Sequence, residues 1–119
     1  MSNDQVHHVL RRDRWIILCL ALIVRLAAAL PQAQPNYMDA TYYAVGGQRL
    51  AQGDGFNDPY VWNYLDQPAT LLDASHIYWM PLSSMLVGIS DAIFGISYRA
   101  AQIPFILLSA LLPLISFSV

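Results

Sequence analysis

Three long apolar runs set the strongest limit on what this chain can fold into. They occupy residues 15–30, 77–96 and 100–119, and the stretch between the first two is polar and aromatic. A bilayer core is crossed by about 20 mostly apolar residues in a helix. Because lipid offers no partner for backbone N–H and C=O groups, such segments must be helical. We therefore predict an all-α, polytopic integral membrane protein with three transmembrane helices.

The composition supports a membrane protein and excludes several other classes. Hydrophobic residues make up 56% of the chain and charged residues 12%, whereas soluble domains carry about 45–50% and about 25%. All six cations are arginine and the net charge is -2, so no basic stripe exists to neutralise phosphates and we expect no nucleic-acid partner. Cys19 is alone, which excludes an internal disulfide and a cysteine metal site.

Arginine bias predicts the orientation. The tail at 1–14 carries three arginines and the turn at 97–99 carries Arg99, whereas the loop at 31–76 has only Arg49 against five aspartates. The positive-inside rule then places the tail and the turn in the cytoplasm, and the loop outside it. A cleaved signal peptide is the alternative for 15–30. Arg25 interrupts that run and two further apolar segments follow, which argues against cleavage.

The extracytoplasmic loop contains a predicted surface helix at about 39–52. Asp39, Tyr42, Tyr43 and Gly46 fall at helical spacing on one face, which Arg49 and Leu50 continue, and Gly53 is a suitable C-terminal cap. We expect this helix to lie on the membrane with its aromatic side down. Asp39 would stand in its first turn, where a carboxylate can also serve simply as a helix cap.

For the other polar or aromatic candidates the sequence leaves alternative roles open. Arg25 lies about 9 Å from the outer end of the first run, where it can reach the headgroups or hold a lipid phosphate. Tyr60, Trp62 and Tyr64 alternate along the loop and suit either sugar stacking or the membrane interface. His76 stands alone at the start of the second run, which is weak evidence for a metal ligand. The second run also carries a stripe of small residues, Ser84, Gly88 and Ala92, which is suited to close helix contact. Its lone acid, Asp91, is better suited to packing than to proton transfer.

The order of these parts resembles the N-terminal portion of lipid-linked-sugar glycosyltransferases of the GT-C fold. A first helix with a late arginine is followed by "YMDATYYAVGGQRLAQGDGF", then by "YWMPLSSMLVGISDAIFG" and an arginine-started third helix. Within that fold the chain resembles protein O-mannosyltransferase-like and aminoarabinose-transferase-like bacterial enzymes, which implies a bacterial-type plasma membrane. The resemblance covers residues 14–119, about the first quarter of such an enzyme. The third run has no polar flank at its end, so we expect the native chain to continue with further transmembrane helices.

The resemblance implies a catalytic role for Asp39, which would be the base or would orient the acceptor. It also makes substrate-binding candidates of five residues: Arg25, Tyr42, Tyr43, Arg49 and His76. Two features depart from the family pattern. Ala40 stands where many relatives have a second acid, and "WMPL" keeps only Pro81 of a proline pair. The missing acid leaves a divalent metal unsupported, so the cofactor stays unknown.

The resemblance implies transfer of a sugar from a polyprenyl-phosphate donor to an acceptor hydroxyl outside the cytoplasm. Asp39 would take the hydroxyl proton at the membrane surface, where the lipid phosphate lies, and Arg25 or Arg49 would offset the charge of the leaving phosphate. The partners would be the lipid-linked donor and membrane lipid. A non-enzymatic small membrane protein or a transporter segment is the alternative, and we expect the 119-residue piece to be inactive by itself.

Overall fold

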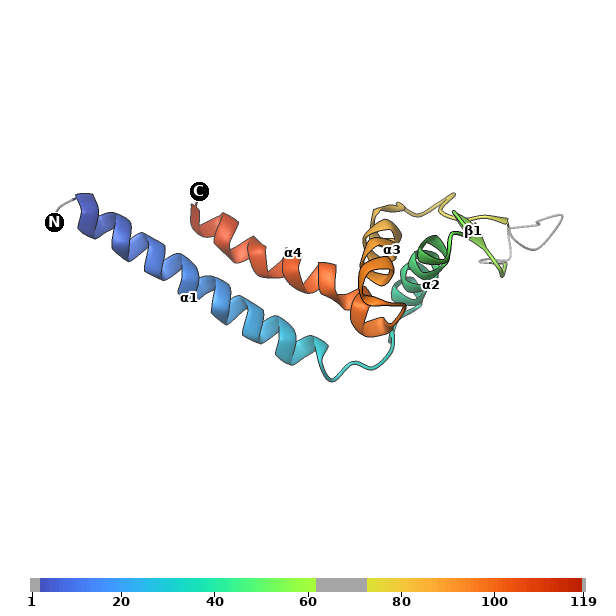
Figure 1. The fold of residues 1–119 in the computed structure, drawn as a ribbon, viewed down its shortest axis with the longest axis horizontal. Helices are drawn as coiled ribbons and strands as arrows, with labels where there is room; N and C mark the ends of the chain where they lie inside the picture. The colour runs from blue at the N-terminus through green and yellow to red at the C-terminus, as the bar shows by residue number, and fades with distance from the viewer. Residues whose placement is uncertain (1–2, 62–72, 119) are drawn as a thin grey trace. The chain divides into compact units, whose positions relative to one another are not determined.

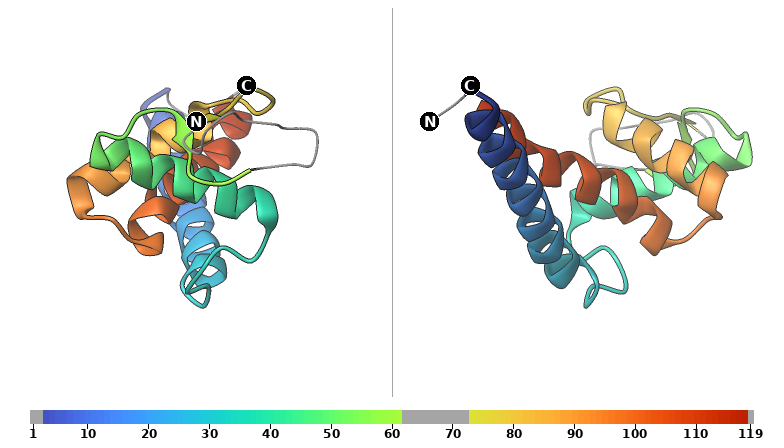
Figure 2. Two further views of the ribbon diagram at one scale, coloured as in Figure 1. Left: turned by 90° about the vertical axis from the view of Figure 1, so that its right-hand side faces the viewer. Right: turned by 60° about the vertical axis from the view of Figure 1, so that its left-hand side comes forward.

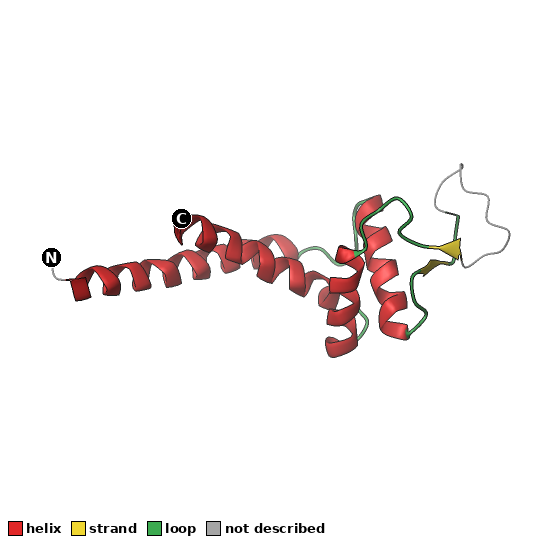
Figure 3. Ribbon diagram, turned by 90° about the horizontal axis from the view of Figure 1, so that it is seen from above, coloured by secondary structure: helices red, strands yellow, loops and turns green. Residues whose placement is uncertain are grey.

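The computed structural model describes residues 3–61 and 73–118. Within these ranges the chain forms four helices and one short pair of strands (Figure 3). It divides into two units: residues 33–103, the α2–α3 unit, and residues 1–32 with 104–119, the terminal-helix unit. The prediction that the chain is built from helices is confirmed. Trp62 and Tyr64, two of the three alternating aromatics, lie outside the described residues.

The terminal-helix unit contains α1, Asn3–Ala29, and most of α4, Tyr98–Ser118. The helix at the N-terminus is longer than the predicted 15–30 because it continues back through the arginine-rich tail. Its apolar part, 15–29, is about 22 Å long at ~1.5 Å per residue. Large apolar side chains on both helices are exposed, among them Trp15 and Ile23 on α1 and Leu112 on α4.

Of the described helices, only α4 is long and apolar enough to cross a membrane, over Tyr98–Phe117. Pro104 and Pro113 lie inside it without ending it, as membrane helices tolerate. The prediction of three transmembrane helices is therefore not supported. The second of them was expected at 77–96, but the helix there is α3, Leu82–Phe94, which is only about 20 Å long against a core of about 30 Å.

The α2–α3 unit is held together by two helices that lie side by side (Figures 1 and 2). α2 spans Met38–Gln52, close to the predicted 39–52, and Gly53 ends it as predicted. Gly53 adopts φ 85° and donates its N–H to Leu50 O at 3.1 Å, while Asp54 N–H bonds Arg49 O at 2.9 Å. This pair of bonds is the Schellman arrangement, in which a left-handed residue closes the last turn.

Glycines allow α2 and α3 to approach closely. A Cβ added at Gly46 would lie 2.7 Å from Ser84 Oγ, and one at Gly47 would collide with the Val87 side chain. On α3, a Cβ at Gly88 would lie 3.1 Å from Gly47 O. Ser84 and Gly88 of the predicted small-residue stripe therefore do pack against a helix, but Ala92 is exposed.

The face of α2 that carries Tyr42 and Gly46 is covered by α3 and by the loop leading into it. Tyr42 is only 3% exposed and bonds His76 of that loop, and Gly46 is buried against Ser84 of α3. The glycines on this face allow the close approach of α3. Tyr42 is therefore not accessible to lipid as the predicted orientation requires, and a membrane position for the helix stays a prediction.

The end of α3 is tied to the first turn of α4. Ser90 Oγ donates to Ala100 O at 2.6 Å, and Ser97 N–H points to Asp91 Oδ1 at 3.4 Å. Ser97 Oγ accepts the N–H of Ala100 at 3.1 Å, which caps α4. Asp91 is 2% exposed, so it acts in packing at this joint, one of the two roles considered for it.

A short antiparallel pair, β1 (Asn57–Asp58) and β2 (Asp73–Ala74), brings the two ends of the loop together. Asn57 stands opposite Ala74, and Ser75 N–H bonds Phe56 O at 3.2 Å. This pairing brings the chain after β2 back to α2, where His76 contacts Tyr42 and lies beside Gly46. It thereby delivers His76 to the helix pair.

Candidate functional site

His76 is the centre of a polar and aromatic cluster in the α2–α3 unit. Its backbone adopts φ 62°, the one left-handed non-glycine position found among the described residues. Histidine enters this region more readily than most residues, and such conformations persist where surrounding contacts hold them. Here the contact is a hydrogen bond of 2.6 Å from His76 N–H to the hydroxyl of Tyr42, 34 residues earlier.

The imidazole of His76 lies between two serine hydroxyls. Nε2 is 2.8 Å from Ser84 Oγ on α3, and Nδ1 is 2.6 Å from Ser75 Oγ. The hydroxyl of Ser84 donates its own proton to the backbone oxygen of Tyr43, at 3.1 Å. It must therefore accept from Nε2, so the neutral ring carries its proton on Nε2 and Nδ1 accepts from Ser75.

This proton arrangement gives no support to a serine nucleophile activated by His76. Activation would require Ser84 to donate to the imidazole, but its proton goes to the Tyr43 carbonyl. Ser84 is also 0% exposed, so no substrate reaches it. The histidine instead joins α2, α3 and the loop in one hydrogen-bonded network.

Asp58 supplies the negative charge of the cluster and is itself buried. Burial raises the pKa of the Tyr42 phenol, the N–H of His76 opposes this, and the charge and hydrogen bond of Asp58 add to the rise. Burial likewise raises the pKa of Tyr60 to about 12, with help from the charge of Asp58. The phenols of both tyrosines are therefore neutral at physiological pH.

His76 is kept neutral by the same environment. Burial lowers the pKa of its imidazole, and the nearby charge of Asp58 only partly offsets that effect. Aromatic rings surround it: the centroid distances are 5.1 Å to Tyr42, 5.4 Å to Phe56 and 6.5 Å to Tyr43. The cluster thus links α2, α3 and the loop through hydrogen bonds and ring contacts.

Asp39 is placed differently from the cluster. It lies in the first turn of α2 and is half-buried, while the N-cap residue is Tyr37, which makes no side-chain cap hydrogen bond. Within residues 3–61 and 73–118 we find no hydrogen bond or ion pair to the Asp39 carboxylate. The simple capping role considered for Asp39 is therefore absent, although its charge still complements the helix dipole.

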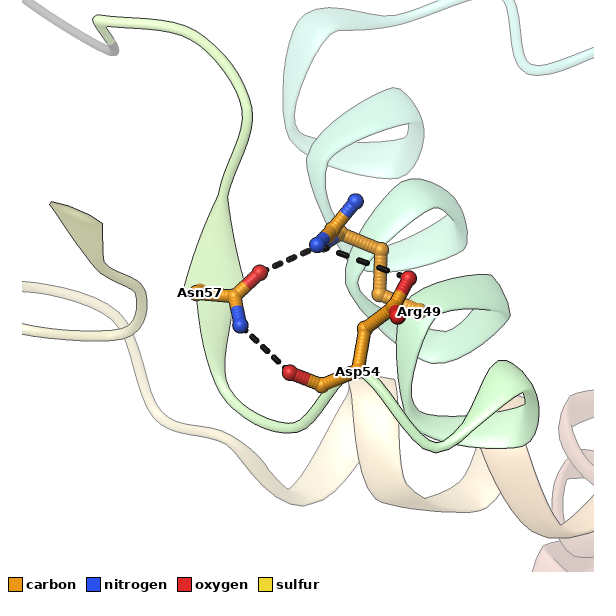
Figure 4. A network of polar contacts seen from close by, with 3 residues as sticks. All are labelled: Arg49, Asp54 and Asn57. Carbon is orange, nitrogen blue, oxygen red and sulfur yellow. Dashed lines mark hydrogen bonds and ion pairs between the residues drawn. The ribbon is translucent and has the colours of Figure 1, made fainter. Parts of the chain in front are cut away.

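Arg49 is engaged at the opposite end of α2 (Figure 4). Its Nε donates to Asn57 Oδ1 at 2.7 Å, and its Nη2 lies 3.4 Å from Asp54 Oδ2. The side-chain amide of Asn57 in turn donates to the backbone oxygen of Asp54. These contacts give Arg49 a structural role, which is to fasten the turn after α2 to β1.

The structure brings together three of the six predicted site residues, namely Tyr42, Tyr43 and His76. Arg25 is exposed on α1, in the terminal-helix unit. Sequence reasoning missed Asp58 and Ser75 and noted Ser84 only for its size. Ser84 bonds the Tyr43 carbonyl 41 residues away, and Ser75 becomes part of the site only because the neighbouring His76 bonds Tyr42, 34 residues earlier. Asp58 likewise acts on Tyr42 and His76, which only the fold brings near it.

Comparisons with known proteins add no relative. No family model matches the chain, and neither the curated proteins nor the solved structures contain a match to it. Within the part of the chain that the structure describes, no three histidine, cysteine or acidic side chains are grouped so that they could hold a metal ion. The site must be interpreted from its own geometry.

Proposed function

We propose that the chain is the N-terminal part of a membrane glycosyltransferase of the GT-C type, which moves a sugar from a polyprenyl-phosphate donor to an acceptor hydroxyl. The observation that carries the proposal is the state of Asp39. Its carboxylate is half-buried, has no structural partner among the described residues, and stands in the first turn of a helix. That helix begins at Met38, shortly after α1 ends at Ala29.

The membrane arrangement that we propose has two crossings. α4 is one, and α1 is the other: its 27 residues are about 40 Å long, so unlike α3 it can reach across a core of about 30 Å, although its apolar part covers only about 22 Å. The α2–α3 unit then lies on the extracytoplasmic side. The arginines of the N-terminal tail, Arg11, Arg12 and Arg14, keep the tail in the cytoplasm. Arg99 then lies on the same side as the α2–α3 unit, so it counts against this orientation, which rests on the three arginines of the tail.

In the proposed reaction the acceptor oxygen attacks the anomeric carbon of the donor sugar. The bond from that carbon to the lipid phosphate breaks, and the phosphate leaves with the electron pair. Asp39 takes the proton of the acceptor hydroxyl, an effect worth about 10²–10⁴ in rate. A base for this reaction must stand near the bilayer surface, because the donor's phosphate is anchored there by its lipid tail.

Of the other predicted site residues, we assign some to substrate binding and some to holding α2 in place. Arg25 is the cation we propose for the lipid phosphate, because Arg49 is already held by Asp54 and Asn57. Tyr43 is half-buried and retains a ring surface for a sugar. Tyr42 and His76 hold α2 in place and so position Asp39 without contacting the donor.

The test is Asp39→Asn in the full-length native protein, in membranes, with transfer measured from polyprenyl-phosphate mannose and polyprenyl-phosphate aminoarabinose. Asparagine keeps the shape but cannot accept the proton, so we expect a loss of about a hundredfold or more at unchanged membrane abundance. Asp54→Asn is the matched control, since it neutralises an acid at the other end of α2. Full activity of the Asp39→Asn protein would remove the catalytic assignment. Absence of transfer by the parent from either donor would favour the non-enzymatic alternative.

A further inference from the structure

One face of α3 is apolar and uncovered. Leu82, Met85, Ile89 and Ile93 are spaced by three, four and four residues, so they lie on one side of the helix, and all four are exposed. The opposite side faces the protein, where Val87 and other residues pack against α2 and the start of α4. α3 therefore has two different faces, of which only one is used inside the α2–α3 unit.

The chain leading into α3 extends this apolar surface. Ile77, Tyr78, Trp79 and Met80 are four consecutive exposed residues before Pro81. We refer to 77–80 with Leu82, Met85, Ile89 and Ile93 as the outer face. It carries no charge, because the only charged residue of α3 is Asp91, which is buried on the other side.

The helix that follows α3 indicates what covers the outer face. α3 ends at Phe94 and α4 begins at Tyr98, and the hydrogen bond from Ser90 to Ala100 fixes the two at this joint. α4 is the helix long and apolar enough to cross a membrane. α3 is thus fastened directly to the point at which the proposed crossing begins.

We propose that the outer face of α3 lies in the interfacial layer of a lipid bilayer, with α3 running along the surface. Tyrosine and tryptophan prefer this layer, and Tyr78 and Trp79 stand where the chain enters the helix. An interfacial helix usually has a charged face toward water, but here the polar face is occupied by packing against α2. The proposal does not depend on the glycosyltransferase assignment.

The proposed position of α3 on the membrane surface is the one that was expected for α2. α2 was expected to lie on the membrane, but its apolar face is taken up by α3. α3 was expected to cross the membrane, but its length is about 20 Å against about 30 Å. A helix that is too short to cross, apolar on one side and tied to a crossing helix is suited to lie on the surface.

The test uses spin labels in the full-length protein, with Cys19→Ser as background. Single cysteines replace Leu82, Met85, Ile89 and Ile93 in turn, and Ala40 and Gln52, exposed on α2, serve as controls. In vesicles of phosphatidylcholine and phosphatidylglycerol, collisions with oxygen report lipid and collisions with a water-soluble nickel chelate report water. We expect all four α3 labels to favour oxygen at similar, shallow depths, and both controls to favour nickel.

Three outcomes would overturn the proposal. Nickel accessibility at the four positions would place the face in water. Low accessibility to both reagents would mean that protein covers it, either another segment or a second copy. A depth that increases along α3 toward the bilayer centre would make it a crossing helix.

Trp79 provides a check that leaves the outer face intact. With Trp15→Phe and Trp62→Phe, its fluorescence is the only tryptophan signal in residues 1–119, and the same two substitutions with Trp79→Phe give the background from any further tryptophans. We expect lipids brominated near the headgroup to quench Trp79 more than lipids brominated deep in the chain. Equal absence of quenching by both would contradict an interfacial position.

Discussion

The α2–α3 unit and the terminal-helix unit differ in how far they bury their side chains. In the first, buried polar groups such as Ser84 and Ser90 find protein partners, and glycines bring the helices into contact. In the second, the large apolar side chains of α1 and α4 are exposed along their length. Together these show that the α2–α3 unit closes its interior, though not the outer face of α3, with its own residues, whereas the terminal-helix unit does not bury its large apolar side chains. Substitutions in the two units test this difference.

Gly47→Leu should have the largest effect. The added side chain would collide with Val87 and approach the backbone of Gly88, and overpacking of this kind costs about 1–3 kcal/mol or more. We expect the thermal midpoint of the solubilised protein, followed by near-ultraviolet circular dichroism, to fall steeply. Leu108→Ala in α4 is the control from the other unit, since Leu108 is exposed and its loss in detergent should cost little. A wild-type midpoint for Gly47→Leu would refute the tight helix contact.

His76→Ala should have the next largest effect. It removes the imidazole contacts to Ser84 and Ser75, at about 0.5–1.5 kcal/mol each, and it leaves a β-carbon at a left-handed position. His76→Gly relieves the backbone but also loses the ring, so the difference between the two reports the strain. If urea unfolding gave both variants the parent's stability, the network would not hold the unit together.

The pH dependence of stability should be smaller and should disappear in His76→Asn. Burial lowers the pKa of His76, so the unfolded state binds the proton more readily than the folded state. Its stabilising contribution is therefore complete above the unfolded pKa of about 6.5 and declines as the pH falls from there toward the folded pKa. Asparagine accepts left-handed geometry but does not titrate. Urea midpoints at several pH values between 5 and 7.5 measure this, and an unchanged slope in His76→Asn would assign the effect to other groups.

Arg49→Gln should have the smallest effect. The ion pair with Asp54 is partly exposed, and such pairs contribute about 0.2–1 kcal/mol. Loss of the Asn57 contact adds a similar amount, and both should show as faster amide exchange in the turn after α2, with little change elsewhere. A large loss of sugar transfer by Arg49→Gln, at normal abundance, would instead return Arg49 to the binding residues.

The helical character of the chain, the span and C-terminal cap of α2, and the apolar nature of α4 were all predictable from local sequence. These features depend on neighbours within a few residues: Gly53 closes the last turn of α2, and unbroken apolar runs form helices. Such local signals are legible because the atoms that create them are close in the chain.

Only the tertiary structure decided which faces are covered and how the cluster is built. The periodicity of α2 showed an apolar face but not that α3 would occupy it, and the run at 77–96 did not reveal that its helix begins only at Leu82. The proton on Nε2 of His76 follows from the bond of Ser84 to the Tyr43 carbonyl, 41 residues away. The physical reason is that packing and hydrogen bonding act between groups close in space, and the long connection between α2 and α3 leaves that proximity unspecified until both helices are in place.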